Sequence, residues 1–152
     1  MTTVYIWNMT SVLHLGHAAL KFGGIGGRAI YVSWWPVERE VGTMIGGVQA
    51  SPHVNLVEDV TGEGKMPDYQ VQVQGLDDGR MRDAWRLWLN SHRYLVWNSS
   101  CATTVAEILR AGGGDMYTSW PGRLIWNPNE VRGYAQAINL GFNKMQAMQS
   151  RA

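Results

Sequence analysis

A cluster of glycines between two strand-like runs constrains the fold more than any other feature of the sequence. Residues 16–22 and 28–35 are rich in apolar, β-branched and aromatic side chains, and they flank Gly23-Gly24-Ile25-Gly26-Gly27. Two such runs around glycines predict an antiparallel hairpin, and Pro36 should end its second strand. A β-branched and aromatic run at residues 3–7 and strict alternation at residues 69–74 predict two further strands.

Three helices are predicted in the second half of the chain. Asp77 or Asp78 can cap a helix that continues to about Ser91, and Ser99 or Ser100 can cap one over residues 101–111. A third helix should begin at Asn127-Pro128, with Glu130 completing its cap. The apolar positions at helical spacing are Met81, Trp85, Trp88 and Leu89 in the first helix, and Val131, Tyr134, Ala135, Ile138, Phe142, Met145 and Met148 in the third.

Residues 37–68 show no sustained period and are broken by glycines and prolines. They predict a long irregular excursion with a short strand at residues 54–57. With strands and helices both present, the predicted fold class is α+β. The length of 152 residues fits one domain, residues 1–152.

Charge and cysteine content exclude several classes of protein. Thirteen basic residues against 12 acidic ones give a net charge of +1, so no basic surface for nucleic acid is indicated. The single cysteine excludes an intramolecular disulfide and a cysteine-rich metal cage. Residues 1–20 carry no Asp, Glu, Lys or Arg, but they lack a basic start and a small-residue cleavage site. The sequence therefore predicts neither a signal peptide nor a membrane span. A chain without them is expected to start in the cytoplasm.

Cys101 is the strongest candidate for chemistry, because it opens a predicted helix. Unpaired N–H groups and the positive end of the dipole at that position favour the thiolate, and the same N–H groups could bind an oxyanion. The alternative is a buried thiol with a purely structural role.

A cysteine nucleophile needs a base, and His17 lies on a predicted strand between small residues. His14, His53 and His92 are interpreted as solvated surface residues, and no metal site is predicted from His14 and His17. If the hairpin loop has odd length and is centred on Ile25, His17 pairs directly with Ser33, and Tyr31 lies on the same side. An even-length loop would place Trp34 opposite His17 instead.

The order of these motifs resembles the permuted papain-type thiol enzymes of the NlpC/P60 superfamily, which include lecithin:retinol acyltransferase-like and YiiX-like proteins. In that family a histidine follows a glycine on a strand and precedes the cysteine that opens a helix, as Gly16-His17-Ala18 and Cys101-Ala102-Thr103-Thr104-Val105-Ala106 do here. The family's third polar group lies on the next strand, where Ser33 or Tyr31 stands. Residues 4–36 and 94–113 also resemble domains of secreted bacterial effectors and toxins.

The resemblance implies an antiparallel sheet packed against a cysteine-bearing helix and further helices, and a thiol peptidase or amidase that needs no cofactor. Cys101 would attack a carbonyl, His17 would accept its proton, and Ser33 would hold the ring. Many relatives have Asn directly before the cysteine, whereas this chain has Ser100 there and Asn98 earlier. These two residues are the candidates for orienting the turn and binding the oxyanion. Tyr31, Trp34 and Trp35 are the candidates for the substrate cleft.

Two other functions stay open at this point. One is an acyltransferase or thioesterase that acts on lipid, as lecithin:retinol acyltransferase-like relatives do, and the other is a non-catalytic interaction module. The expected partners are a peptide or amide substrate and an immunity or target protein, with no nucleic acid and no membrane. The effector resemblance implies export into a target cell by a machine that needs no signal peptide, such as the type VI system.

Overall fold

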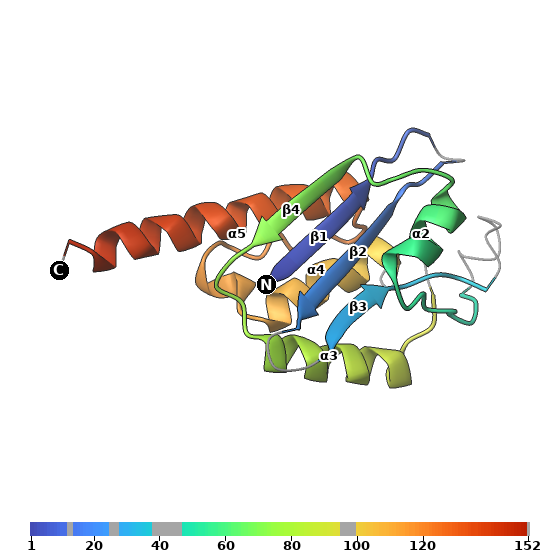
Figure 1. Ribbon diagram of the computed structural model, residues 1–152, viewed down its shortest axis with the longest axis horizontal. Helices are drawn as coiled ribbons and strands as arrows, with labels where there is room; N and C mark the ends of the chain where they lie inside the picture. The colour runs from blue at the N-terminus through green and yellow to red at the C-terminus, as the bar shows by residue number, and fades with distance from the viewer. Residues whose placement is uncertain (12–13, 25–27, 38–46, 95–99, 152) are drawn as a thin grey trace.

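The computed structural model describes residues 1–11, 14–24, 28–37, 47–94 and 100–151. Its four strands form one antiparallel sheet in the order β3-β2-β1-β4 (Figure 1). The strands are β1 (Thr2–Trp7), β2 (His17–Gly23), β3 (Ala29–Ser33) and β4 (Tyr69–Val73). The helices are α2 (Leu56–Glu63), α3 (Asp78–Ser91), α4 (Cys101–Ala111) and α5 (Pro128–Gln149), with a short 3-10 helix η1 (Gly114–Met116). The predicted α+β class is confirmed.

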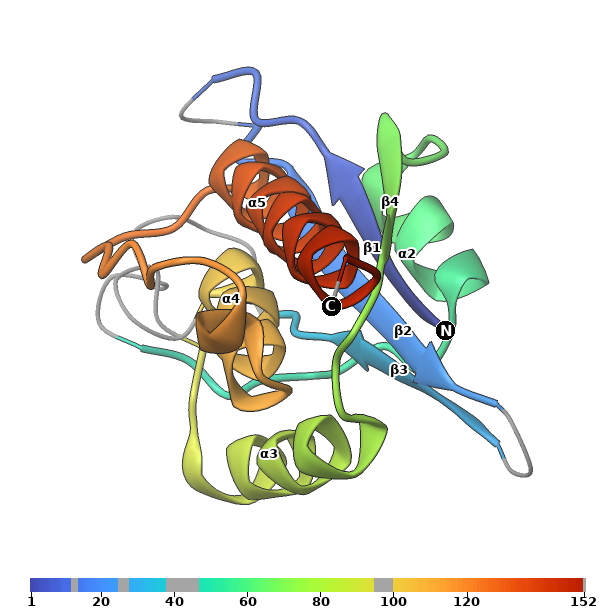
Figure 2. The ribbon, with the colours of Figure 1, turned by 90° about the vertical axis from the view of Figure 1, so that its left-hand side faces the viewer.

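The sheet carries helices on both faces. Figure 2 shows α2 on one side, and α3, α4 and α5 on the other. The larger core lies on the three-helix side, where Ile6 and Leu20 of the sheet belong to the same buried cluster as Val105 of α4. A smaller cluster on the α2 side contains Tyr5, Trp7 and Ala19. Because both faces are covered, Trp7 and His17 are almost completely removed from solvent, at 0% and 2% exposure.

Polar caps begin the helices where the sequence predicts them. The side chain of Asp77 accepts a hydrogen bond from Arg80 N–H and starts α3, and that of Ser100 accepts from Thr103 N–H and starts α4. Asn127 and Glu130 form a reciprocal capping box at the start of α5. Each cap satisfies amides that a helix cannot bond internally, so these predicted boundaries are confirmed.

The strand predicted at residues 54–57 is wrong, because the helix α2 begins there. Asn55 accepts a hydrogen bond from Glu58 N–H, and Gly64 ends the helix in a left-handed conformation with φ of 78°. The helix is only 8 residues long and buries a single side chain, Asp59. Two partly buried side chains, Leu56 and Val60, pack this helix on the sheet, and two such positions in 8 residues are too few to set a helical period, which is why periodicity alone missed it.

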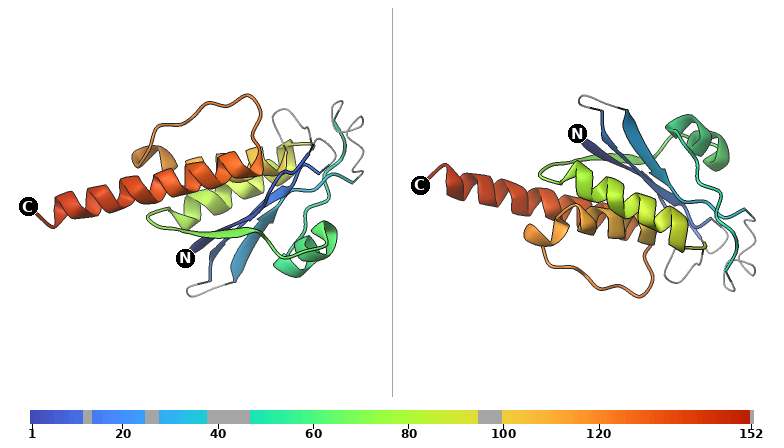
Figure 3. Two further views of the ribbon diagram at one scale, coloured as in Figure 1. Left: turned by 90° about the horizontal axis from the view of Figure 1, so that it is seen from above. Right: turned by 90° about the horizontal axis from the view of Figure 1, so that it is seen from below.

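Two of the predicted apolar helix faces include side chains that are exposed in the structure. Leu89 of α3 is 40% exposed, and Met145 and Met148 of α5 are 36% and 72% exposed. Phe142 still packs against Tyr117, with ring centroids 5.6 Å apart, but the end of α5 continues past the sheet and the other helices (Figure 3), which leaves Met145 and Met148 exposed. None of the helices in the described part of the chain is long and apolar enough to cross a membrane.

Gly16, directly before β2, should tolerate no side chain. Its φ is +73°, and an added Cβ would overlap the Trp7 carbonyl oxygen and lie 2.7 Å from the backbone carbon of Asn8. We expect Gly16→Ala to lower the free energy of unfolding by about 3 kcal/mol or more, from left-handed strain plus the backbone clash. Gly64→Ala is the matched control, because Gly64 has φ +78° but nothing within 4 Å. It should cost only about 1 kcal/mol in urea unfolding, and equal losses would contradict the clash.

Candidate active site

Cys101 and His17 meet where α4 begins and β2 begins. Cys101 is the first residue of α4, and His17 is the first residue of β2. The Cys101 thiol contacts the His17 ring, the backbone N–H of Ala18 and the hydroxyl of Tyr94. Both side chains are buried, with 8% of Cys101 and 2% of His17 exposed. The fold thus brings together two residues that are 84 positions apart in the sequence.

A buried carboxylate, Asp59 of α2, lies on the other side of the His17 ring. His17 Nε2 is 3.0 Å from Ser33 Oγ and 3.2 Å from Asp59 Oδ2. Ser33 Oγ donates its own proton to Asp59 Oδ1 at 2.6 Å. Because that proton is committed to Asp59, Ser33 can only accept from His17, so Nε2 must carry the ring proton. Nδ1 is therefore the nitrogen that remains to accept a proton from the thiol.

The predicted contact between His17 and Ser33 is present, but the predicted strand pairing is wrong. Ser33 pairs with Ala19 and Tyr31 with Lys21, a register two residues away from the predicted one. A shift of two residues keeps every side chain on its face of the sheet, so Ser33 still faces the His17 ring. The alternative that places Trp34 on the face of His17 is excluded by the same register.

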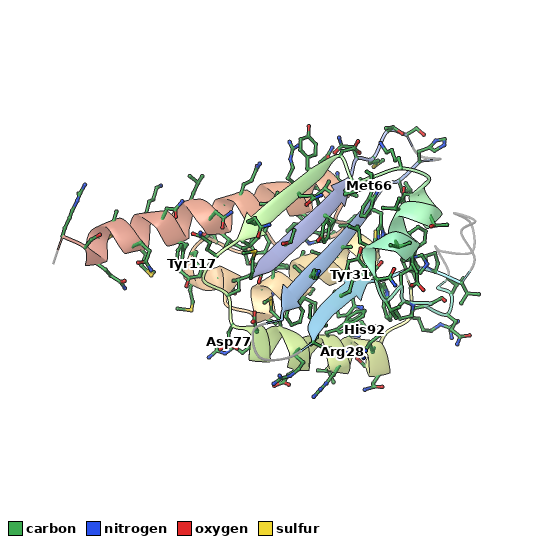
Figure 4. All side chains as sticks on the ribbon, in the orientation of Figure 1. Arg28, Tyr31, Met66, Asp77, His92 and Tyr117 are labelled. Atoms are coloured by element: carbon green, nitrogen blue, oxygen red, sulfur yellow. The ribbon has the colours of Figure 1, made fainter. Side chains whose placement is uncertain are left out.

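Asp59 is completely buried and accepts hydrogen bonds from several directions. Besides Ser33, its Oδ1 accepts from Trp35 Nε1 at 2.6 Å and from His53 Nδ1 at 2.8 Å. The hydroxyl of Tyr31, on β3 beside α2 (Figure 4), donates to Oδ2. A carboxylate that accepts this many bonds is held in one orientation, and it holds the His17 ring in turn.

The charges in this cluster stabilise one another. Burial raises the pKa of the Asp59 carboxyl, but bonds from His17, Ser33 and Tyr31 and the charge of His17 outweigh burial and hold that pKa well below its usual range. Burial lowers the pKa of His17, yet the Cys101 thiolate and Asp59 raise it to about 10. Burial likewise raises the pKa of Cys101, and the charge of His17 reverses this and lowers it. The pair is therefore favoured as thiolate and imidazolium.

The first turn of α4 is the predicted location of an oxyanion site. Ser100, predicted to orient this turn, accepts a hydrogen bond from Thr103 N–H at 3.3 Å and so fixes the start of the helix. The N–H groups of Cys101 and Ala102 come before Thr103, on a turn where an α-helix has no internal acceptors. Asn98, the other predicted orienting residue, lies outside the described residues.

A cleft of about 660 Å³ opens beside the thiol. The predicted cleft residues Trp34 and Trp35 line it, whereas Tyr31 does not and is engaged with Asp59 instead. Polar and charged side chains form part of its wall. These are Asn8, Thr10, His14, Glu63, Lys65 and Tyr94. The cleft therefore opens onto the otherwise buried pair of Cys101 and His17.

Sequence reasoning missed Asp59, Tyr94 and the role of His53. His14 and His92 are exposed as predicted, but His53 is not a solvated residue, because it bonds Asp59 and stacks on Trp35. The spacing of Asn55 and Glu58 is a capping signal that could have identified α2. No local signal could have shown that Asp59 reaches His17, because that contact spans 42 positions and depends on how α2 packs on the sheet.

Comparisons with known proteins identify relatives among bacterial toxins. The chain is 32% identical over 75 residues, 46% of its length, to the multifunctional-autoprocessing repeats-in-toxin of Vibrio cholerae serotype O1. It is also 32% identical over 81 residues, 50% of its length, to the protein of the same name from Vibrio vulnificus. These relatives are very long, and the match spans only 2% of each of them.

A family model gives the broader match. The model of the IcsB middle domain matches residues 50–152, which is more than half of the chain and includes both Asp59 and Cys101. His17 and Ser33 precede the matched segment and are joined to it by the contacts described above. On this match, the chain belongs to the family of the IcsB middle domain.

Proposed function

We propose that the protein is a cysteine-dependent acyl-transfer enzyme that uses Cys101, His17 and Asp59. The observation that carries the proposal is the 3.2 Å contact of His17 Nε2 with a buried carboxylate, while the Cys101 thiol contacts the same ring. A nucleophile, a base and a group that orients the base are the parts that covalent catalysis of acyl transfer requires.

The first half-reaction forms a thioester on Cys101. The thiolate attacks the substrate carbonyl carbon, and the amides of Cys101 and Ala102 stabilise the resulting oxyanion. The tetrahedral intermediate collapses, the bond to the leaving group breaks, and the imidazolium of His17 gives its proton to that group. Asp59 keeps the proton on Nε2 throughout, so the proton exchanged with the substrate is the one on Nδ1.

The second half-reaction decides the class of enzyme. With water as acceptor, His17 takes a proton from water, the hydroxide attacks the thioester, and the carboxylic acid leaves as Cys101 is restored. The protein is then a peptidase or amidase. Hydrolysis needs no site for a second substrate, so it is the simplest function that this geometry supports.

A second candidate is transfer of the acyl group to an amine or hydroxyl acceptor. The burial of the reactive pair favours this candidate, since only 8% of Cys101 and 2% of His17 are exposed to solvent. The rings of Trp7 and Trp35 also flank the His17 ring, with centroids 5.3 Å and 4.6 Å away. A thioester shielded in this way reacts more slowly with bulk water and survives longer for a bound acceptor.

The biological setting that we propose is that of a bacterial effector or toxin domain delivered into a target cell. Membership of the IcsB middle domain family and the similarity to two Vibrio toxins support it. Growth of bacterial and eukaryotic cells expressing the wild type, Cys101→Ala or His17→Ala, in the cytoplasm or with an export signal, tests this setting. Growth inhibition should require both residues. Inhibition that survives both substitutions would instead indicate an interaction module.

The chemistry is tested by covalent labelling. We expect iodoacetamide to alkylate Cys101 at least about tenfold faster than N-acetylcysteine at about pH 6, because the charge of His17 lowers the pKa of the protein thiol, whereas a free thiol is almost entirely protonated there. Cys101→Ala, which removes the single cysteine, is the blank. Equal rates would contradict an activated nucleophile.

A second experiment distinguishes hydrolysis from transfer. With p-nitrophenyl acetate as acyl donor, mass spectrometry should find acetyl-Cys101. Release of acetate despite added glycinamide indicates a hydrolase, and formation of the amide indicates a transferase.

A further inference from the structure

His53 lies next to the proposed triad, and the proposed chemistry does not use it. Its Nδ1 is 2.8 Å from Asp59 Oδ1, on the carboxylate oxygen opposite the one that His17 contacts. Because Asp59 is held ionised, it can only accept, so His53 must donate from Nδ1. One buried carboxylate is thus shared between two histidines, one on each oxygen.

The position of His53 is fixed by backbone and ring contacts. Its backbone N–H donates to the Ser33 carbonyl at 3.1 Å, and Ser51 N–H donates to the Trp35 carbonyl at 2.6 Å, so this segment runs along β3 and its continuation. The His53 ring stacks on the ring of Trp35, with centroids 4.4 Å apart and planes at 21°. Trp35 in turn donates to Asp59 and flanks His17.

From these contacts we infer that His53 is a positioning residue for the proposed active site, acting through Asp59 and Trp35. It anchors Oδ1 so that Oδ2 remains directed at His17 Nε2. This inference rests on the proposed function, since it assigns no separate reaction to His53. The side chain of His53 is 24% exposed and does not touch the thiol. The inference differs from a purely structural role because it links this ring to the charge state of Cys101.

The chain of effects has a definite sign. Without the His53 donor, Asp59 loses one of the bonds that orient it, and its hold on the His17 imidazolium weakens. When the protonated His17 ring is less stable, it stabilises the Cys101 thiolate less, so the thiol should ionise at higher pH. The groups that face Asp59 in the described structure are Tyr31 and Ser33 of β3, Trp35, His17 of β2 and His53 itself.

Two substitutions separate the hydrogen bond from the stacked ring. His53→Asn places an amide N–H near the position of Nδ1 and removes the ring, whereas His53→Phe keeps a ring on Trp35 and removes the donor. The experiment is the rate of Cys101 alkylation by iodoacetamide as a function of pH, at a temperature well below the lowest melting temperature in the set. His92→Phe is the matched control, because His92 also stacks on a tryptophan, Trp88 at 3.8 Å, but is bonded to Ser91.

We expect His53→Phe and His53→Ala to move the midpoint of the alkylation profile up by about half to one pH unit, which is about a threefold to tenfold loss of rate below the midpoint. His53→Asn and His92→Phe should keep the wild-type midpoint. An unchanged midpoint in His53→Phe, or a shift in His53→Asn as large as that in His53→Phe, would overturn the inference. Wild-type Cys101 that reacts no faster than N-acetylcysteine would instead overturn the proposed function, so the two failures are distinguishable.

Discussion

Asp59→Asn is expected to reduce turnover of p-nitrophenyl acetate by about 10³- to 10⁴-fold while the protein stays folded. The groups around Asp59 all donate to it, and His17 donates from Nε2. An asparagine directs an N–H at one of these donors. If it faces His17, Nε2 must accept, and the ring proton moves to Nδ1, the nitrogen that has to receive the proton from Cys101. The base is then in the wrong tautomer for the reaction.

The control for this substitution lies on the same helix. Glu58 is the neighbour of Asp59 on α2, but it is exposed and accepts from the backbone N–H of Val54. Glu58→Gln keeps an acceptor for that bond and should leave turnover within about twofold of wild type. Thermal unfolding confirms that each variant is folded. Turnover by Asp59→Asn close to the wild-type rate would remove Asp59 from the proposed triad and leave Cys101 and His17 as a dyad.

The parts of the site that sequence reasoning could predict are those with local signals. Ser100 and the helix that it caps place Cys101 on a first turn, and the glycines of the hairpin place His17 and Ser33 on one face. These signals depend on backbone geometry within a few residues. The predicted register is wrong by two residues, but the predicted contact is still present, because a shift by an even number of residues leaves every side chain on the same face of the sheet.

The parts that could not be predicted depend on packing between distant elements. Asp59 belongs to a segment without apolar periodicity, and its place beside His17 follows from the packing of Leu56 and Val60 of α2 with the cluster of Tyr5, Trp7 and Ala19. In the same way, the spacing of Met145 and Met148 is helical, but whether anything covers them depends on how far α5 extends past the sheet. Spacing predicts which side chains share a face, and not what that face meets.

The pH dependence of Cys101 reactivity should change strongly when His17 is removed. In the wild type the imidazolium persists up to a pKa of about 10 and holds the pKa of Cys101 below its ordinary value, so alkylation by iodoacetamide should remain fast at a lower pH than for a free thiol. In His17→Ala that charge is lost, and burial then raises the pKa of the thiol. With a thiol pKa of about 8.5 or higher, at most about 0.3% of the His17→Ala thiol is thiolate at about pH 6, so alkylation there should be at least about 100-fold slower than in the wild type.

The difference should close as the pH rises, because above its own pKa the thiol of His17→Ala ionises without help. A merely structural defect would slow alkylation by a similar factor at every pH, so convergence of the two curves identifies the charge of His17 as the cause. His14→Ala provides the control, since His14 lines the same cleft but is exposed and contacts Ser11. Its profile should superimpose on that of the wild type. If His17→Ala also superimposes on the wild type, the thiolate is not maintained by His17, and the ion pair on which the proposed mechanism depends does not form.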